Sequence, residues 1–364
     1  MNEKNHEVST KLKLIRQTLG ENEAQALRLR GTDWFAWATA GGSNTVLLTA
    51  ETGIAEVLVT TQEAWILTDE IEAQRLQDEE LPSNFQIHVS PWADVATREA
   101  FVRDVTDGGK IISDRPLPHI EKRLPASLIH HKRVIMSSEL ERYRQVGRKA
   151  SEAMTEVLNA ALPTWTEYQL AGAGAEALWA RGLHPALTLV AGEKRLPLYR
   201  HATATGDVIG RQAMMVFCAR GYGLYASLTR FVCFGTLADE KALHQHVREI
   251  EAVVLNISQS GTSLDAAYNA LAQAYEQHGF PYAIHQHHQG GTTGYLAREI
   301  VANPLTTDTL TENMAVAWNP SLPGAKVEDT FAIVDGKLEN LTFDPNFPNV
   351  EVEGRLRPVP LEIR

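Results

Sequence analysis

The chain has 364 residues, of which 44% are hydrophobic and 22% charged, and its formal net charge is -11. This composition is typical of a globular protein long enough for two domains, and the acidic balance argues against nucleic-acid binding, which needs clustered lysine and arginine. Two cysteines, Cys218 and Cys233, are too few for a disulfide framework, and no segment resembles a signal peptide or a membrane span. We therefore expect a cytoplasmic protein without nucleic-acid or membrane partners.

Residues 1–135 are predicted to form an α/β domain. The β-rich runs "AEVLVT", "AWILT", "FQIHVS" and "KIIS" occur among charged helical stretches such as "EIEAQRLQDEE". The segment "DRPLPHIEKRLPASLIHHKR" then carries three prolines and mixed charge, which is typical of a linker. We place a domain boundary after it, between residues 135 and 136.

Residues 136–364 are predicted to alternate helix pairs with strands. Ser138 with Glu141, and Thr164 with Glu167, have the spacing of capping boxes, which predicts two helix starts. Gly182 is expected to end the second helix. A second helix pair is expected at 238–257 and 263–279, and the strands are expected in "AMMVFCA", "LYASLTRFVCFG", "MAVAWNP" and "VEDTFAIV". The repeated order predicts an α+β fold whose two halves face each other across a cleft.

Four segments of this second half resemble the creatinase, aminopeptidase P and prolidase family. They are "LVAGEKRLPLYRHATATGD", "GLYASLTR", "HHQGGTTGY" followed by "ARE", and "AVAWNP" followed by "KVEDT". The first half is similar to the smaller N-terminal domain of the same proteins. The resemblance implies an α+β protein with a C-terminal pita-bread domain and an N-terminal α/β creatinase-type domain, and it implies a homodimer.

The peptidases of this family bind two metal ions through two aspartates, a histidine and two glutamates. The resemblance assigns these positions to Cys218, Ser227, Gly291, Asn319 and Glu328. Only Glu328 has the expected side chain, and a hard divalent cation needs several anionic oxygens. The resemblance therefore implies a lost metal site and no cofactor. The alternative is a divalent metal, for example Zn²⁺ bound by Cys218, nearby histidines and Glu328.

Creatinase has this architecture and acts on a C–N bond without metal, using a histidine that the resemblance assigns to His201. A neutral imidazole near pH 7 can act as general base or acid, although His201 can also be a structural residue of its loop. His285, His287 and His288 are expected on one strand, with the first two on the same face. His287 also matches a substrate-facing histidine of the family.

Arg230, Tyr295, Arg298 and Asn319 complete the expected substrate site. An arginine can bind a carboxylate with two parallel hydrogen bonds, so Arg230 and Arg298 predict a small zwitterionic or anionic substrate. Arg298 can instead pair with Glu299 or Glu328.

Three functions are compatible with this sequence. The first is metal-independent, creatinase-like hydrolysis of a C–N bond in a small compound, with His201, His287 and Glu328 as catalytic residues. The second is an Xaa-Pro aminopeptidase or prolidase with an unorthodox metal site and a dipeptide-like substrate. The third is a non-catalytic binding protein. The histidine-rich site favours the first function over the third, and the count of metal ligands weighs against the second.

Overall fold

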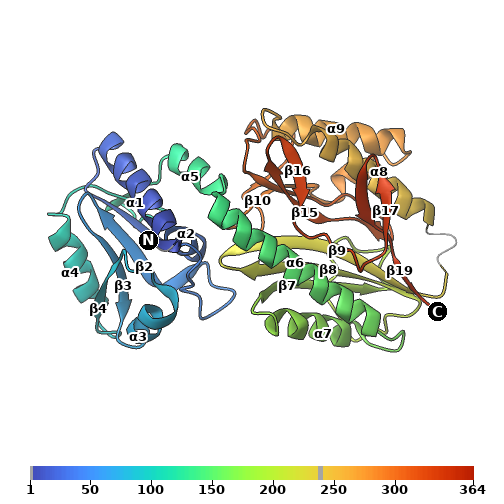
Figure 1. The fold of residues 1–364 in the computed structure, drawn as a ribbon, viewed down its shortest axis with the longest axis horizontal. Coiled ribbons are helices and arrows are strands. Elements are labelled where there is room, and N and C mark those ends of the chain that lie inside the picture. Colours follow the sequence, from blue (N-terminus) through green and yellow to red (C-terminus); the bar gives the residue numbers. More distant parts are fainter. Residues whose placement is uncertain (1–2, 237–240) are drawn as a thin grey trace. The chain divides into compact units, whose positions relative to one another are not determined.

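The computed structural model describes residues 3–236 and 241–364. The chain divides into two compact units, Met1–Leu140 and Glu141–Arg364 (Figure 1). The boundary expected from the prolines lies a few residues before this division.

The first unit is built on a mixed six-stranded sheet in the order β4-β3-β2-β1-β5-β6. The strands are β1 (Ala26–Gly31), β2 (Thr52–Thr60), β3 (Ala64–Asp69), β4 (Gln86–Ser90), β5 (Ile111–Ser113) and β6 (Glu121–Arg123). The helices are α1 (Glu3–Glu21), α2 (Thr32–Ala38), α3 (Ala73–Arg75), α4 (Val95–Val105) and α5 (Ala126–Arg133), and a π-helical turn, Leu76–Glu80, follows α3. Leu58 and Leu67 of the sheet pack with Val102 of α4 in one apolar core.

The prolines of the expected linker do not interrupt the structure. The segment instead supplies β6 and α5, because Pro125 stands just before the helix, where its missing N–H costs no hydrogen bond. Leu128 is fully buried, and the Lys132 ammonium is buried 2.8 Å from an Asp33 carboxylate oxygen. The linker prediction was therefore wrong.

Helix α6 (Ser137–Ala160) begins with a different cap from the predicted one. Glu139, and not Glu141, reaches back to the start of the helix, where its Oε2 accepts a hydrogen bond from Met136 N at 2.8 Å. The Ser138 hydroxyl donates to another carboxylate and does not cap the helix.

Helix α7 (Glu167–Trp179) also starts at a residue other than the predicted Thr164. Thr166 and Gln169 form a complete capping box, each side chain bonding the other residue's backbone N–H. Gly182 follows the helix with φ +72°, as expected for a glycine that ends a helix.

The second unit contains two principal sheets. One has the order β19-β9-β8-β7 and the other β11-β10-β12-β15-β16. Their strands are β7 (His184–Gly192), β8 (Gln212–Gly221), β9 (Leu224–Phe234), β10 (Gly290–Thr293), β11 (Ile300–Val301), β12 (Ala315–Trp318), β15 (Asp329–Val334), β16 (Lys337–Asn340) and β19 (Leu361–Ile363). Two hairpins accompany them, β13 (Ser321–Leu322) with β14 (Ala325–Lys326) and β17 (Asn349–Val352) with β18 (Arg355–Pro358). A bridge between Thr229 and Glu328 joins β9 to the chain entering β15.

Helices α8 (Lys241–Ile257) and α9 (Leu264–Gln277) lie together against the five-stranded sheet (Figure 1). Their apolar residues pack with Val316, Trp318 and Phe331 of that sheet. The predicted start of α8, residues 238–240, lies outside the described residues. None of the helices in the described ranges has the length and apolar composition that a bilayer span requires.

Candidate functional site

Two loops of the second unit bring three histidines together. His201 comes from the loop between β7 and β8, and His287 and His288 precede β10. The Nε2 atoms of His201 and His287 are 2.9 Å apart, and one ring nitrogen from each of the three residues lies within 4.8 Å of the others. We call these residues the three-histidine group.

His285 does not belong to this group, because the strand expected at 285–288 does not form. Residues Ala283–His285 make a 3₁₀ turn, and β10 begins only at Gly290, with φ +105°. His285 is exposed, and the alternation of strand faces does not apply to it. The prediction that His285 and His287 share a face was therefore wrong.

All three imidazoles of the group are held in the neutral form. Partial burial lowers the pKa of His201, and the charge of Lys326 lowers it further. The same two causes lower the pKa of His287 strongly. Burial and the charge of Arg298 lower the pKa of His288 to about 4. Near pH 7 each ring therefore keeps a lone pair that can accept a proton.

Glu328 lies beside this group, buried between two cations. Its Oε1 accepts a hydrogen bond from Arg298 Nη2 at 2.6 Å, and Lys326 Nζ lies 3.5 Å from Oε2. Burial alone would raise the pKa of Glu328, but Lys326 and Arg298 outweigh it and hold the pKa below the usual value. Of the two roles open to Arg298, the structure shows internal pairing with Glu328.

The other positions that the resemblance assigns to metal ligands carry neutral groups. The thiol of Cys218 lies 3.3 Å from the Ser227 hydroxyl, and burial raises the pKa of this thiol, so it is protonated. Strands β12 and β15 are antiparallel, with Trp318 opposite Asp329. Asn319, the residue after Trp318, therefore stands opposite Glu328, the residue before Asp329. Its Oδ1 is buried without a hydrogen-bond partner among the described residues.

The backbone at Gly291 leaves no space for a histidine side chain. Its φ is +149°, and a Cβ added there would lie 2.0 Å from the carbonyl oxygen of Ile300. Substitution of this glycine would therefore require the strand pair to shift.

These residues do not fit a pair of hard divalent ions. A single carboxylate remains, and two side-chain cations already neutralise it. The neighbouring thiol, hydroxyl and amide supply no further negative charge. A zinc ion bound by Cys218 would have to displace the proton of this buried thiol, because zinc binds the thiolate and not the thiol.

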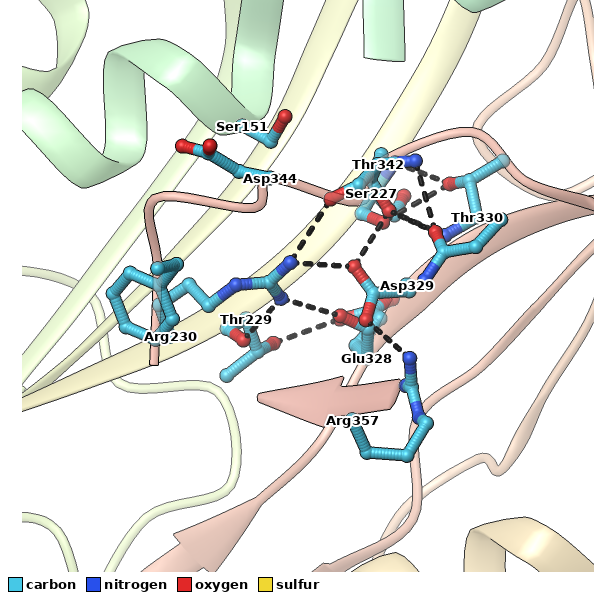
Figure 2. A network of polar contacts seen from close by, with 12 residues as sticks. Ser151, Ser227, Thr229, Arg230, Glu328, Asp329, Thr330, Thr342, Asp344 and Arg357 are labelled. Carbon is cyan, nitrogen blue, oxygen red and sulfur yellow. Dashed lines mark hydrogen bonds and ion pairs between the residues drawn. The ribbon is translucent and has the colours of Figure 1, made fainter. Parts of the chain in front are cut away.

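Arg230 and Tyr295 occupy the interior of the fold. Arg230 is 4% exposed and its Nη2 donates to Asp329 Oδ1 at 2.8 Å and to the Thr342 carbonyl at 3.0 Å (Figure 2). Tyr295 is 1% exposed. Both side chains are therefore part of the packed core.

Two basic residues near the group were not predicted from the sequence as site residues. Lys326 stands two residues before Glu328, a spacing that places both on the same side of an extended chain. Arg200 adjoins His201 and donates from Nη2 to Gln286 Oε1 at 2.9 Å. The Nε and Nη1 atoms of Arg200 are buried without hydrogen-bond partners among the described residues.

A family model identifies the class of protein to which this fold and site belong. The model of metallopeptidase family M24 matches residues 141–335, which is more than half of the chain. The chain therefore belongs to metallopeptidase family M24, and the resemblance seen in the sequence is confirmed.

Solved structures of this class have the same fold over nearly the whole chain. The X-Pro aminopeptidase from Thermotoga maritima MSB8 is 18% identical, with a TM-score of 0.76 over 92% of this chain and 98% of that one. The prolidase from Pyrococcus horikoshii OT3 is also 18% identical, with a TM-score of 0.77 over the same shares. The Xaa-Pro dipeptidase from Bacillus anthracis is 18% identical, with a TM-score of 0.77 over 98% of this chain and 100% of that one. These matches confirm the pita-bread fold. No curated protein matches the chain by sequence.

Proposed function

We propose that the protein is a metal-independent hydrolase that cleaves a C–N bond in a small zwitterionic or anionic compound. The observation that carries this proposal is the contact between His201 and His287, whose Nε2 atoms lie 2.9 Å apart. One of these two neutral rings donates its proton to the other. The charged groups Glu328, Arg298 and Lys326 influence the protonation of His201.

In the proposed reaction His201 is the general base and acid. Its Nε2–H donates to His287 Nε2, which leaves Nδ1 of His201 free to accept a proton from the attacking water. The water oxygen forms a bond to the carbon, the C–N bond breaks, and the same proton passes to the leaving nitrogen. His287 stabilises the charged imidazolium, because a hydrogen bond from a charged donor is stronger than a neutral one.

The positive groups favour a substrate that carries a carboxylate. Arg200 has two N–H groups without partners, and Arg298 Nε is also buried without a hydrogen-bond partner in the described ranges. A carboxylate bound to either guanidinium would form charge-assisted hydrogen bonds. Glu328 has a positioning role in this proposal, since it holds Arg298 and Lys326 in place.

The test compares hydrolysis by the parent protein and by His201→Ala. N-acyl amino acids, lactams, guanidino acids and Xaa-Pro dipeptides are incubated with each protein, and amine release is followed by mass spectrometry. Loss of a general base typically lowers the rate by about 10²–10⁴-fold, so we expect this loss in His201→Ala. The activity of the parent protein is expected to persist after treatment with a chelator.

His285→Ala is the matched control, because His285 is an exposed histidine of the same segment outside the group. It is expected to retain full activity. Activity that chelation abolishes and added metal restores would contradict metal independence. Equal rates in His201→Ala and the parent protein would contradict the role of His201.

A metallopeptidase with an unorthodox metal site is the second candidate function. Its support is the geometry of the three-histidine group, whose three ring nitrogens lie close enough for one ion. The two candidates differ at His288, which only a metal site requires. Under this second candidate His288→Ala loses both activity and bound metal. Binding of a compound without any turnover would instead favour the third function, a non-catalytic binding protein.

A further inference from the structure

A second histidine cluster lies on helices α8 and α9, outside the three-histidine group. His246 and Glu249 are three residues apart on α8, so their side chains project from one face of the helix. His278 directly follows the last residue of α9. The Nδ1 atoms of His246 and His278 are 2.9 Å apart, and Oε2 of Glu249 lies 3.8 and 3.6 Å from them respectively.

We propose that His246, Glu249 and His278 bind a Zn²⁺ ion, and we call them the helix-pair site. Two histidines and a carboxylate are a ligand set that zinc proteins use, with Zn–N and Zn–O distances near 2.1 Å. The two Nδ1 atoms and Oε2 of Glu249 are all about 2.0 Å from one point between them, and this distance is close to a Zn–N or Zn–O bond length. At bond lengths near 2.1 Å the ion lies slightly out of the plane of the three atoms, and a water molecule completes four-coordination.

Packing holds the His246 ring and the backbone that carries His278 before the ion binds. The end of α9 is closed by a hydrogen bond from Phe280 N to Tyr275 O at 2.8 Å, and Gly279 has φ +85°. The His246 ring packs against the Phe280 ring with centroids 5.8 Å apart. Binding therefore costs little side-chain ordering, which favours affinity.

The site is accessible to an ion from solvent. The side chains of His246, His278 and Glu249 are 37%, 22% and 37% exposed. His278 and Glu249 line a groove of about 700 Å³, together with Glu351, Glu353 and Arg248. Carboxylates outnumber cations in this lining, so the groove attracts a divalent cation.

Zinc binding is tested on the full chain carrying His201→Ala and His287→Ala, which dismantles the three-histidine group. This background protein is stripped of metal and titrated with Zn²⁺, and retained zinc is measured by mass spectrometry after desalting. We expect about one zinc ion per chain and a Tm that rises with zinc, since a ligand that binds only the folded state stabilises it. Co²⁺ in place of zinc is expected to give the visible absorption bands of four-coordinate cobalt.

Added to this background, His278→Ala or His246→Ala is expected to weaken zinc binding by at least about 100-fold, because each removes a direct ligand. Glu249→Gln is expected to weaken it as well. His285→Ala, which removes an exposed histidine outside both clusters, is expected to change nothing. Zinc retention that survives both histidine substitutions would overturn the proposal, and so would failure of the background protein to retain zinc. Neither result depends on catalysis, so the outcome is independent of the proposed hydrolase activity.

Discussion

Asp329 pairs with two buried arginines of the second unit. It lies between two arginines, with Oδ1 2.8 Å from Arg230 Nη2 and Oδ2 2.7 Å from Arg357 Nη1, and it accepts a hydrogen bond from Thr342 (Figure 2). Burial lowers the pKa of Arg357, but Glu251 and Asp329 outweigh this and raise it, so the guanidinium stays charged. Asp329 therefore serves as a counter-charge to both arginines, and Arg357 also pairs with Glu251.

We predict that Asp329→Ala lowers the free energy of unfolding by about 3–5 kcal/mol, because it leaves two buried guanidinium groups without this partner. Urea unfolding followed by circular dichroism measures the change. Glu276→Ala is the control, since Glu276 is an exposed carboxylate of α9, and its effect is expected to stay within about 0.5 kcal/mol. An Asp329 variant as stable as the parent protein would show that the network is dispensable for the fold.

Helix α7 packs closely against strand β8 at Gly174. Gly174 faces β8, where an added Cβ would lie 2.8 Å from the Phe217 ring and 3.1 Å from the Met215 methyl group. Both of those side chains are fully buried, and the Phe217 ring would have to shift to admit a Cβ. Gly172 lies on the exposed face of the same helix, and a Cβ there would meet nothing within 4 Å.

We predict opposite effects of alanine at these two positions. Gly172→Ala is expected to stabilise the protein by about 0.5–1 kcal/mol through helix propensity alone. Gly174→Ala gains the same propensity but crowds the β8 side chains, and overpacking costs about 1–3 kcal/mol, so we expect net destabilisation. Thermal unfolding of both variants tests this, and equal stabilisation by both would contradict the close packing of α7 on β8.

Elements with a strong apolar period were predictable from the sequence, whereas local caps and turns were not. The strands around Met214, Phe231 and Phe331 were found because whole runs of their residues are buried. The cap of α7 was misplaced by two residues, since Thr164 and Thr166 both have a suitable partner three residues later. Short polar patterns of this kind recur by chance, and only the packed chain selects among them.

The candidate site was predictable where it depended on spacing along the chain. Asn319 and Glu328 were both assigned to the site from the sequence, and the register of β12 with β15 brings them opposite each other. The contact of His201 with His287 joins loops 86 residues apart, and no sequence pattern specifies such a distance. Lys326 was missed, although it stands two residues before Glu328 and this spacing places both side chains on the same side of an extended chain.

At the scale of the whole molecule, the chain has the M24 fold. The side chains at the positions that the resemblance assigns to metal ligands differ in charge from the ligands of the family's peptidases. The matched family region spans residues 141–335. It includes Arg298, which pairs with Oε1 of Glu328, and Lys326, which pairs with Oε2. The positive charge beside this glutamate comes from side chains. Both ion pairs of Glu328 therefore lie inside the region that the family model matches.

We predict that Mn²⁺ leaves the Tm of the protein unchanged. Manganese prefers carboxylate and water ligands, and Glu328 is already paired with two cations. Thermal scans with and without excess Mn²⁺ test this, with Zn²⁺ as the comparison ion because the helix-pair site is expected to respond to it. A Tm that rises and saturates with Mn²⁺ in a protein that carries His246→Ala and His278→Ala, and so lacks the helix-pair site, would show that the site at Glu328 still binds a hard cation.

The pairing of Glu328 with Arg298 and Lys326 also determines where the positive charge beside this carboxylate comes from. A metal ion must be captured from the surroundings, and it dissociates again at a rate that the site sets. The guanidinium of Arg298 and the ammonium of Lys326 are part of the polypeptide. Neither is lost when metal ions are scarce or when other proteins compete for them. The two ion pairs of Glu328 therefore form as soon as the second unit folds.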